Sequence, residues 1–230
     1  MLTWPVAILT PRDIEVTLFP LNVSGGRSMA GFEQVLASDA GFWSIVYGSI
    51  PINTPAEVAK WREWQGITAG RAFKFFVPIL PAWQSKDTVA VIGHGTGLVF
   101  DIPFSDESLF DDDSGFSQIT DDPYTGDFAA HSTVIDMKVT AGSAPTAGVY
   151  FTLLDRLYLI MEVLEGEAVS GGVVYRMAIT PPLRTDVEED EEVNFATPYT
   201  ICRLLKDDGM SASFSLARYA DPTVEFVEAF

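Results

Sequence analysis

The side chains whose type and spacing could bind a cation lie in an acidic stretch near the middle of the chain. Asp111, Asp113 and Gly115 match part of a calcium-binding loop, in which alternate carboxylates and a glycine enclose the ion. The glycine follows the second acid too early, however, and no glutamate closes the loop at its twelfth position. A turn in a solvated acidic segment is the simpler interpretation, and cation binding by residues 105–127 stays open.

Nucleophilic and metal chemistry has few candidate residues elsewhere. His94 lies between glycines in GHGTG, but the helix start that a phosphate-binding loop needs does not follow it, which favours a turn between strands. His131 has no serine or cysteine motif near it, and Cys202, in an apolar run, is interpreted as a small core residue. One cysteine and two histidines are too few ligands for zinc. We expect no catalytic residue, no metal, no cofactor and no enzyme activity.

The charge balance is the strongest compositional feature. The 230 residues include 32 acidic and 14 basic side chains, a formal net charge of −18. Such a surface repels the phosphates of nucleic acids, so specific DNA binding is disfavoured. No apolar stretch approaches the ~20 residues of a membrane span, and the first residues lack the basic start of a signal peptide. We expect a soluble protein that is not exported by the general secretory route.

The start of one helix is well specified by the sequence, and we expect the neighbouring segments to be organised around this helix. Thr54 suits the N-cap, Pro55 suits the first helical position, and Glu57 completes a capping box three residues after the threonine. Gly66 is expected to end the helix.

Bulky apolar side chains follow this helix start at helical and then at strand spacing. Trp61 and Trp64 share one helix face, and the segment AFKFFVP predicts a strand that contains Phe73 and Phe75 and ends at Pro78. We interpret these aromatic residues as packed core. A platform on which a ligand stacks is the alternative.

The rest of the amino-terminal sequence alternates apolar and polar residues, as half-buried strands do. Strands are predicted at residues 14–19, 32–37 and 41–47, with a loop of hairpin length at 38–40 between the last two. Residues 22–27 contain two glycines and predict a turn. The expected fold class is mainly β: a β-sandwich with one short helix laid across it.

The second half has a different texture. Residues 87–101 predict a short strand pair, and residues 105–127 predict a long acidic loop. An alternating strand is predicted at residues 132–140, and three strands of a meander follow at 149–154, 157–164 and 173–180. Short strands at this spacing fit a small closed β-barrel of the OB type. The like-charge block at 186–192 predicts a solvated turn.

The carboxy-terminal sequence predicts a hairpin and a last strand. The hairpin consists of residues 199–206, an Asp-Asp-Gly turn at 207–209, and residues 212–218. Residues 223–230 form the final strand.

Three stretches together resemble the distal tail proteins of long-tailed, siphovirus-type bacteriophages and gene transfer agents. The first is the amino-terminal unit, with LNVSGGRSM, GFWSIVYGSIPI, TPAEVAKWREWQG and GRAFKFFVP. The second is AGVYFTLLDRLYLIMEVLEG followed by VVYRMAITPPLR, and the third is the carboxy-terminal YTICRLLKDDGMSASFSLARYADPTVEFVEAF. This resemblance covers about two thirds of the chain.

The resemblance implies both an architecture and a structural role. Residues 1–83 and 197–230 would form one discontinuous, ring-forming β-sandwich domain, and residues 84–196 an inserted OB-like barrel. Six copies would form a homo-hexameric ring at the virion tail tip, assembled in the host cytoplasm, that joins the tail tube protein to the tail hub protein of the baseplate. DNA would pass through the channel without specific binding, and no membrane would be involved.

Charge then suggests which residues form ring contacts. Like charges must be kept apart in such a ring, so residues 105–127 and 186–192 are expected to be exposed and away from subunit contacts. The scarce cations of the sandwich region are the candidate ring contacts, namely Arg12, Arg27, Arg62 and Arg71.

Two rival functions remain open at this point. A carbohydrate-binding or receptor-binding tail appendage could use some of the 5 tryptophans and 7 tyrosines as stacking platforms. A glycan hydrolase could use two of the many carboxylates, but adjacency in so acidic a sequence does not identify a catalytic pair.

Overall fold

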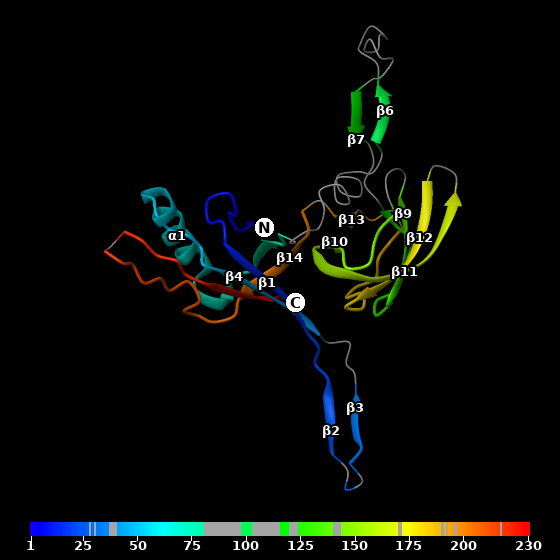
Figure 1. Ribbon diagram of the computed structural model, residues 1–230, viewed down its shortest axis with the longest axis horizontal. Helices are drawn as coiled ribbons and strands as arrows, with labels where there is room; N and C mark the ends of the chain where they lie inside the picture. The colour runs from blue at the N-terminus through cyan, green and yellow to red at the C-terminus, as the bar shows by residue number, and fades with distance from the viewer. Residues whose placement is uncertain are drawn as a thin grey trace. The chain divides into compact units, whose positions relative to one another are not determined.

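The chain is represented by a computed structural model in which two compact units are defined by their contacts. The first unit contains residues 1–79 and 200–230, and the second contains residues 80–199. The structure describes residues 1–27, 29, 31–36, 41–80, 98–102, 116–119, 124–139, 144–169, 172–189, 191, 193–195, 197–216 and 218–230. The fold class is mainly β, as predicted, with several antiparallel sheets consistent with a β-sandwich-type fold (Figure 1).

The first unit is built on a five-stranded sheet whose order differs from the order of the chain. The strands run β1-β4-β15-β14-β5 across the sheet. Their bounds are β1 Asp13–Phe19, β4 Phe42–Gly48, β15 Val224–Glu228, β14 Tyr199–Leu204 and β5 Phe75–Pro78. Strand β15 pairs antiparallel with both β4 and β14. The prediction that the carboxy-terminal strands pair with the amino-terminal ones is therefore confirmed.

Alternation along the strands places one aromatic core under this sheet. In β4 the side chains of Trp43, Ile45 and Tyr47 are buried, while the residues between them are half-buried. The ring of Trp4 packs against Tyr47, Trp64, Phe75 and Phe226, with centroids 5.1–6.2 Å apart. Aromatic pairs at such separations stabilise a core beyond their buried area. Residues far apart in the sequence thus form one cluster.

The helix α1, Pro55–Thr68, begins as predicted but ends later. Its capping box is present: the Glu57 N–H donates to Thr54 Oγ1 at 3.3 Å, and Glu57 Oε2 accepts from the Asn53 and Thr54 N–H groups. These backbone hydrogen bonds, led by that from Asn53, lower the pKa of Glu57. Because the pKa is lowered, this carboxylate stabilises the helix start at higher pH and loses its contribution as pH falls through the lowered value.

The prediction that Gly66 ends α1 was wrong. The helix continues to Thr68, which is buried and whose Oγ1 donates to the Trp64 carbonyl at 2.9 Å. A glycine in a helix costs only about 1 kcal/mol, which the packing of the last turn outweighs. The helix ends where Ala69 (φ 43°) and Gly70 (φ 77°) adopt left-handed conformations, and the 3-10 turn η1, Gly70–Ala72, follows.

Gly66 and Gly70 are expected to respond to alanine with opposite signs. A Cβ at Gly66 meets nothing within 4 Å, so Gly66→Ala should stabilise the first unit by ~0.5–1 kcal/mol through helix propensity. A Cβ at Gly70 would lie 2.9 Å from Asp207 Oδ1 in a left-handed backbone, so Gly70→Ala should destabilise by ~1–2 kcal/mol. Urea unfolding of both variants measures the difference. Equal effects of the two substitutions would contradict a helix that passes through Gly66 and stops before Gly70.

A separate two-stranded hairpin lies beyond the ends of β1 and β4. Its strands are β2, Val23–Arg27, and β3, Glu33–Leu36. The predicted turn at residues 22–27 was wrong, as was the predicted hairpin between the strands at 32–37 and 41–47. Strand β3 pairs with β2, and this pair lies beyond the ends of β1 and β4 at Phe19 and Phe42 (Figure 1). We call residues 19–36 the arm.

The carboxy-terminal hairpin was also predicted with the wrong partner. Strand β14 pairs with β15, and the segment at 212–218 contributes no strand to that ladder. This segment is held instead by isolated bridges from Ser215 to Tyr219 and from Ile52 to Ala220. Leu216 has a φ of 51° and an 86% exposed side chain.

The largest sheet of the second unit has six strands and its own core. Its order is β13-β10-β11-β12-β9-β8. The bounds are β8 Tyr124–Thr125, β9 Val134–Val139, β10 Tyr150–Leu153, β11 Arg156–Val169, β12 Gly172–Thr180 and β13 Val193–Asn194. One buried cluster takes side chains from β9, β10, β11, β12 and β13, so these five strands share one core. This is the construction expected of a barrel-type unit.

The acidic block at 186–192 is more than a solvated turn. Asp186, Glu188 and Glu189 are exposed, as expected. Val187 between them is only 2% exposed, belongs to the core cluster and pairs with Phe128. The charges thus flank a buried anchor of the second unit.

Two further strands fall within the middle of the sequence. Strands β6, Leu98–Ile102, and β7, Phe116–Ile119, pair antiparallel. Residues 105–127 were predicted as one long loop, which is wrong at β7 and β8. A strand pair was predicted within residues 87–101, but β6 pairs with β7 at residues 116–119.

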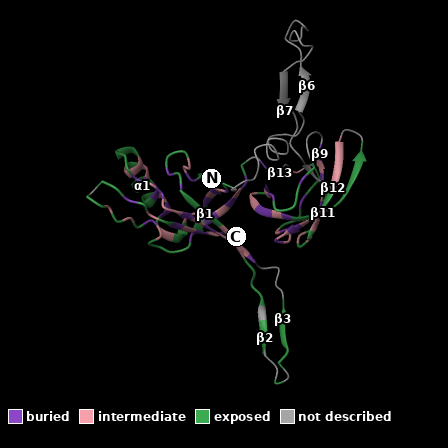
Figure 2. Cartoon of the chain, in the orientation of Figure 1, coloured by how far each residue is buried: buried purple, intermediate pink, exposed green. Residues whose placement is uncertain are grey.

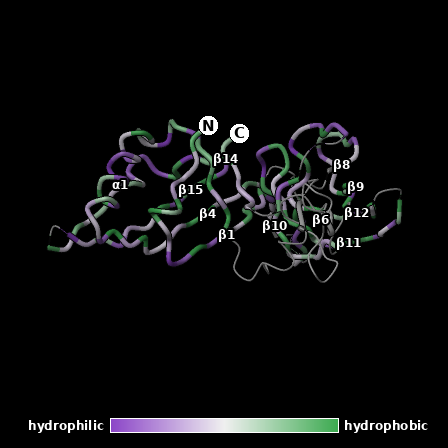
Figure 3. Tube along the Cα trace, turned by 90° about the horizontal axis from the view of Figure 1, so that it is seen from above, coloured by the Kyte–Doolittle hydropathy of each residue, from purple (hydrophilic) through white to green (hydrophobic). Residues whose placement is uncertain are grey.

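Among the described residues no helix is long and apolar enough to cross a membrane, and α1 mixes hydrophilic and hydrophobic positions (Figure 3).

Candidate interaction surface

The residues predicted as core are largely where they were expected. Trp61 and Phe75 are 1% and 0% exposed, so both predictions are confirmed. Phe73 is only half-buried: it precedes β5 and stacks on Phe75 with centroids 6.4 Å apart. Its assignment to the packed core is corrected. Strand β5 begins two residues later, at Phe75, so Phe73 lies outside the strand in which it was predicted.

Tryptophans offer no exposed stacking platform in the part of the chain that the structure describes. Trp4, Trp43, Trp61 and Trp64 are all at most 3% exposed. The Trp61 indole N–H donates to the Met210 carbonyl at 3.1 Å, so its polar atom is also satisfied inside the protein. These side chains hold the first unit together and do not face a ligand.

Two of the four candidate ring arginines are already paired within the chain. The Arg71 guanidinium grips Asp207 through Nε–Oδ1 (3.1 Å) and Nη2–Oδ2 (3.2 Å), and the Arg71 N–H donates to Oδ1 at 3.1 Å. Hydrogen bonding to Arg71 lowers the pKa of Asp207. Arg12 lies 3.5 Å from Asp221, with both side chains more than half exposed. Surface pairs of this kind contribute little stability.

The other two candidate arginines differ from these. Arg62 is exposed on α1 and has no ion pair within the described residues. Arg27 ends β2, and its side chain lies outside the described residues. The role of the four arginines as ring contacts stays a prediction.

Of the residues singled out for chemistry, the structure describes Cys202 and His131. Cys202 is fully buried, as predicted, and His131 is exposed in a left-handed turn with φ 66°. Asp111, Asp113, Gly115 and His94 lie outside the described residues. Among the residues that are described, no group of three or more His, Cys, Asp or Glu could hold a metal ion.

Two buried polar side chains are explained by the sheet. The Tyr47 hydroxyl donates to the Pro78 carbonyl, and burial raises the pKa of this phenol. Glu228 is 3% exposed and its Oε2 accepts from the Trp43 N–H at 3.1 Å, just beyond the last β4–β15 pair. A buried carboxylate needs such hydrogen bonds to be tolerated. Glu228 thus links the neighbouring strands β15 and β4, whereas Tyr47 links β4 to β5, at the far edge of the same sheet.

One polar depression lies beside the carboxy-terminal strands. It is lined by Lys206, Asp208, Gly209, Ser211, Thr223 and Glu225. Lys206 Nζ and Glu225 Oε2 are 3.1 Å apart, so these two charges pair with each other. The third charged residue of the lining is Asp208, and the depression is mostly polar.

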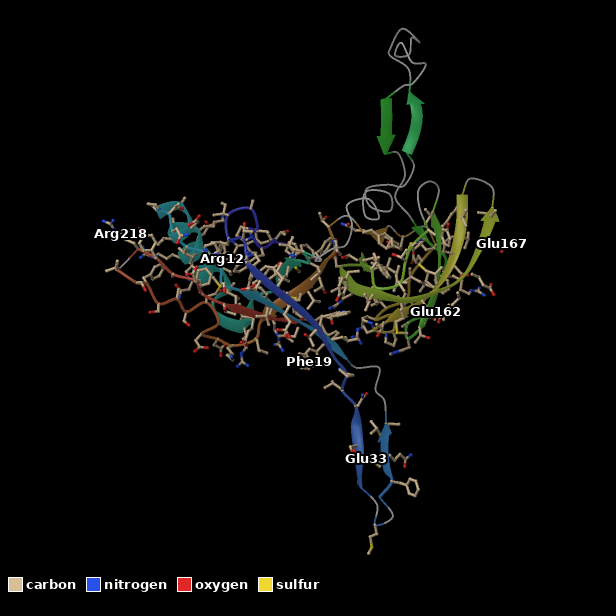
Figure 4. All side chains as sticks on the ribbon, in the orientation of Figure 1. Arg12, Phe19, Glu33, Glu162, Glu167 and Arg218 are labelled. Carbon is tan, nitrogen blue, oxygen red and sulfur yellow. The ribbon has the colours of Figure 1, made fainter. Side chains whose placement is uncertain are left out.

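The arm exposes several large apolar side chains. Met29 is fully exposed, Phe32 is 79% exposed and Leu36 is 68% exposed. All four residues of β3 are exposed, and the arm is drawn in green along most of its length in Figure 2. Phe19 marks its base and Glu33 its middle in Figure 4. This surface was not predicted from the sequence, although one signal was available: residues 19–36 contain only one acid and one base.

The comparisons with known proteins leave the function to be argued from these features. No model of a known protein family matches the chain, and no curated protein sequence matches it.

Proposed function

We propose that this chain is a structural component of a phage tail tip: a distal tail ring of six identical subunits that joins the tail tube to the hub. The proposal rests on the sequence resemblance to distal tail proteins. It assigns no catalytic residue and no cofactor to the chain.

The single observation that carries the proposal is the interrupted first unit. Strands β14 and β15 lie between β4 and β5 in its sheet, so residues 200–230 complete a sheet that the first 79 residues begin. An entire second unit is inserted between these two parts. This is the arrangement that the resemblance implies, and it supports the proposal independently of any single motif.

The charge of the chain is compatible with a DNA conduit. Six copies at −18 each would carry −108, which disfavours adhesion of DNA phosphates during passage. The same charge requires subunit contacts to form where acids are scarce. The arm is such a place.

The proposal is tested by the mass and shape of the purified full chain. Sedimentation velocity should show a species of about six times the 25.1 kDa subunit mass, and electron microscopy should show six-fold rings. Added salt should favour assembly, because repulsion between exposed charges is screened over ~10 Å at 0.1 M. A trimer would favour the receptor-binding appendage instead, and a monomer at every concentration and ionic strength would contradict a ring.

A further inference from the structure

The two edges of the five-stranded sheet differ in whether another segment of the chain pairs with them. The β5 edge is covered: the Trp4 N–H donates to the Phe76 carbonyl at 2.9 Å and the Phe76 N–H donates to the Leu2 carbonyl at 2.8 Å. The β1 edge is open, because within the described residues no backbone segment pairs with its outer side. Alternate residues of an edge strand turn their N–H and C=O groups outward.

The β1 edge also lacks most of the features that protect edges from pairing. Natural edge strands are usually short, bulged or interrupted by proline. Strand β1 has seven residues, no proline, and an unbroken register with β4 from Asp13 to Phe19. Its exposed charges are two carboxylates, Asp13 and Glu15. They disfavour an acidic incoming strand and leave the edge suited to a neutral one.

The arm has the charge and surface that such an edge accepts. One acid and one base balance within residues 19–36 of a chain whose total charge is −18. Six apolar side chains of the arm are 48% exposed or more: Phe19, Leu21, Met29, Phe32, Val35 and Leu36. At these exposures the six side chains leave on the order of 800 Å² of apolar surface in contact with water. One partner contributes about this area to a standard protein interface.

The arm does not cover the edge of its own sheet. It lies beyond the ends of β1 and β4, and only residues 20–22 separate β1 from β2. An isolated two-stranded hairpin is at best marginally stable in water, so the arm needs a surface beyond itself.

We propose that the arm of one copy docks along the β1 edge of a second copy of this chain and adds a strand to that sheet. The contact joins two different surfaces, so it is heterologous and closes into a ring when the rotation between copies permits. The number of copies rests on the proposed ring function, whereas the contact itself rests on the arm and the edge.

A matched pair of surface variants tests the role of the arm. Met29→Ser and Phe32→Ser together remove exposed apolar side chains from the arm. Leu216→Ser removes one that is 86% exposed, two residues before Arg218, which lies far from Glu33 of the arm in Figure 4. Sedimentation of the full chain should show association weakened at least tenfold by the arm variant and unchanged by Leu216→Ser. Equal effects, or no effect of the arm variant on a wild-type oligomer, would overturn the proposal.

Disulfide trapping tests the edge. Cys202 is buried, so Glu15→Cys on β1 and Gln34→Cys on β3 each introduce one accessible thiol. A mixture of the two variants should form a covalent heterodimer under mild oxidation, in excess over either homodimer. Predominant Gln34→Cys homodimers would place arm against arm and overturn the contact.

The two tests separate this inference from the proposed function. A six-fold ring that survives the arm variant, without the heterodimer, would refute the contact and leave the ring. A wild-type chain that stays monomeric and forms no disulfide would refute both.

Discussion

Replacing Trp61 with alanine is expected to lower the free energy of unfolding of the first unit by ~3–5 kcal/mol. The side chain is 1% exposed, so the substitution leaves a cavity under the sheet. It also removes the hydrogen bond from the indole N–H to the Met210 carbonyl, 3.1 Å away. An unpaired buried carbonyl adds ~1–3 kcal/mol to such a loss when water cannot reach it.

Urea unfolding followed by tryptophan fluorescence and by hydrogen exchange measures this effect. Arg62→Ala is the matched control, because Arg62 is the next residue on α1 and is exposed. It should change stability by less than ~0.5 kcal/mol. Trp61→Phe should fall between the two, since it keeps most of the apolar area and loses the N–H. A Trp61→Ala protein of unchanged stability that no longer associates would place this residue in an interface.

Removing residues 197–230 is expected to unfold the first unit completely and leave the second unit folded. The deletion takes away β14 and β15, which separate β4 from β5 in the sheet. Residues 1–79 would then retain the β1–β4 pair and an unconnected β5, with Phe226 missing from the aromatic cluster. The core of the second unit, which ends at Phe195, remains intact.

Hydrogen exchange resolved by segment gives the clearest readout of this deletion. Protection should disappear throughout residues 1–79 and persist in β9, β10, β11 and β12. Deleting residues 21–36 of the arm is the control, because that deletion leaves the five-stranded sheet whole and should preserve protection in β4. If residues 1–79 remained protected and unfolded cooperatively without the carboxy-terminal strands, the discontinuous unit would be refuted.

Sequence alone was sufficient where neighbouring residues decide the structure. The capping box at Thr54 and Glu57 needs only residues three apart, and it formed as predicted. The alternation in β4, β9 and β12 likewise identified strands and their buried faces, because side chains of a strand point to opposite sides. The mainly-β class follows from these local patterns.

The tertiary structure decided the features in which local preference is weak or misleading. Gly66 is a poor helix residue, but the buried Trp64 and Thr68 around it carry α1 one turn further. Residues 23–27 are rich in turn formers, yet they form strand β2 because they pair with β3. Val187 lies in an acidic block and is nevertheless core, because Phe128 pairs with it from another part of the chain.

The candidate interaction surface belongs to this second group. The sequence of residues 19–36 shows which side chains are apolar. It does not show that these residues lie beyond the five-stranded sheet, where their side chains are exposed. The open β1 edge is equally invisible to local patterns, because it depends on which strands cover which edges: residues 2–4 reach β5, and β15 enters beside β4. Pairing between distant strands has no local signature, since the free energy that selects it comes from the completed sheet and its common core.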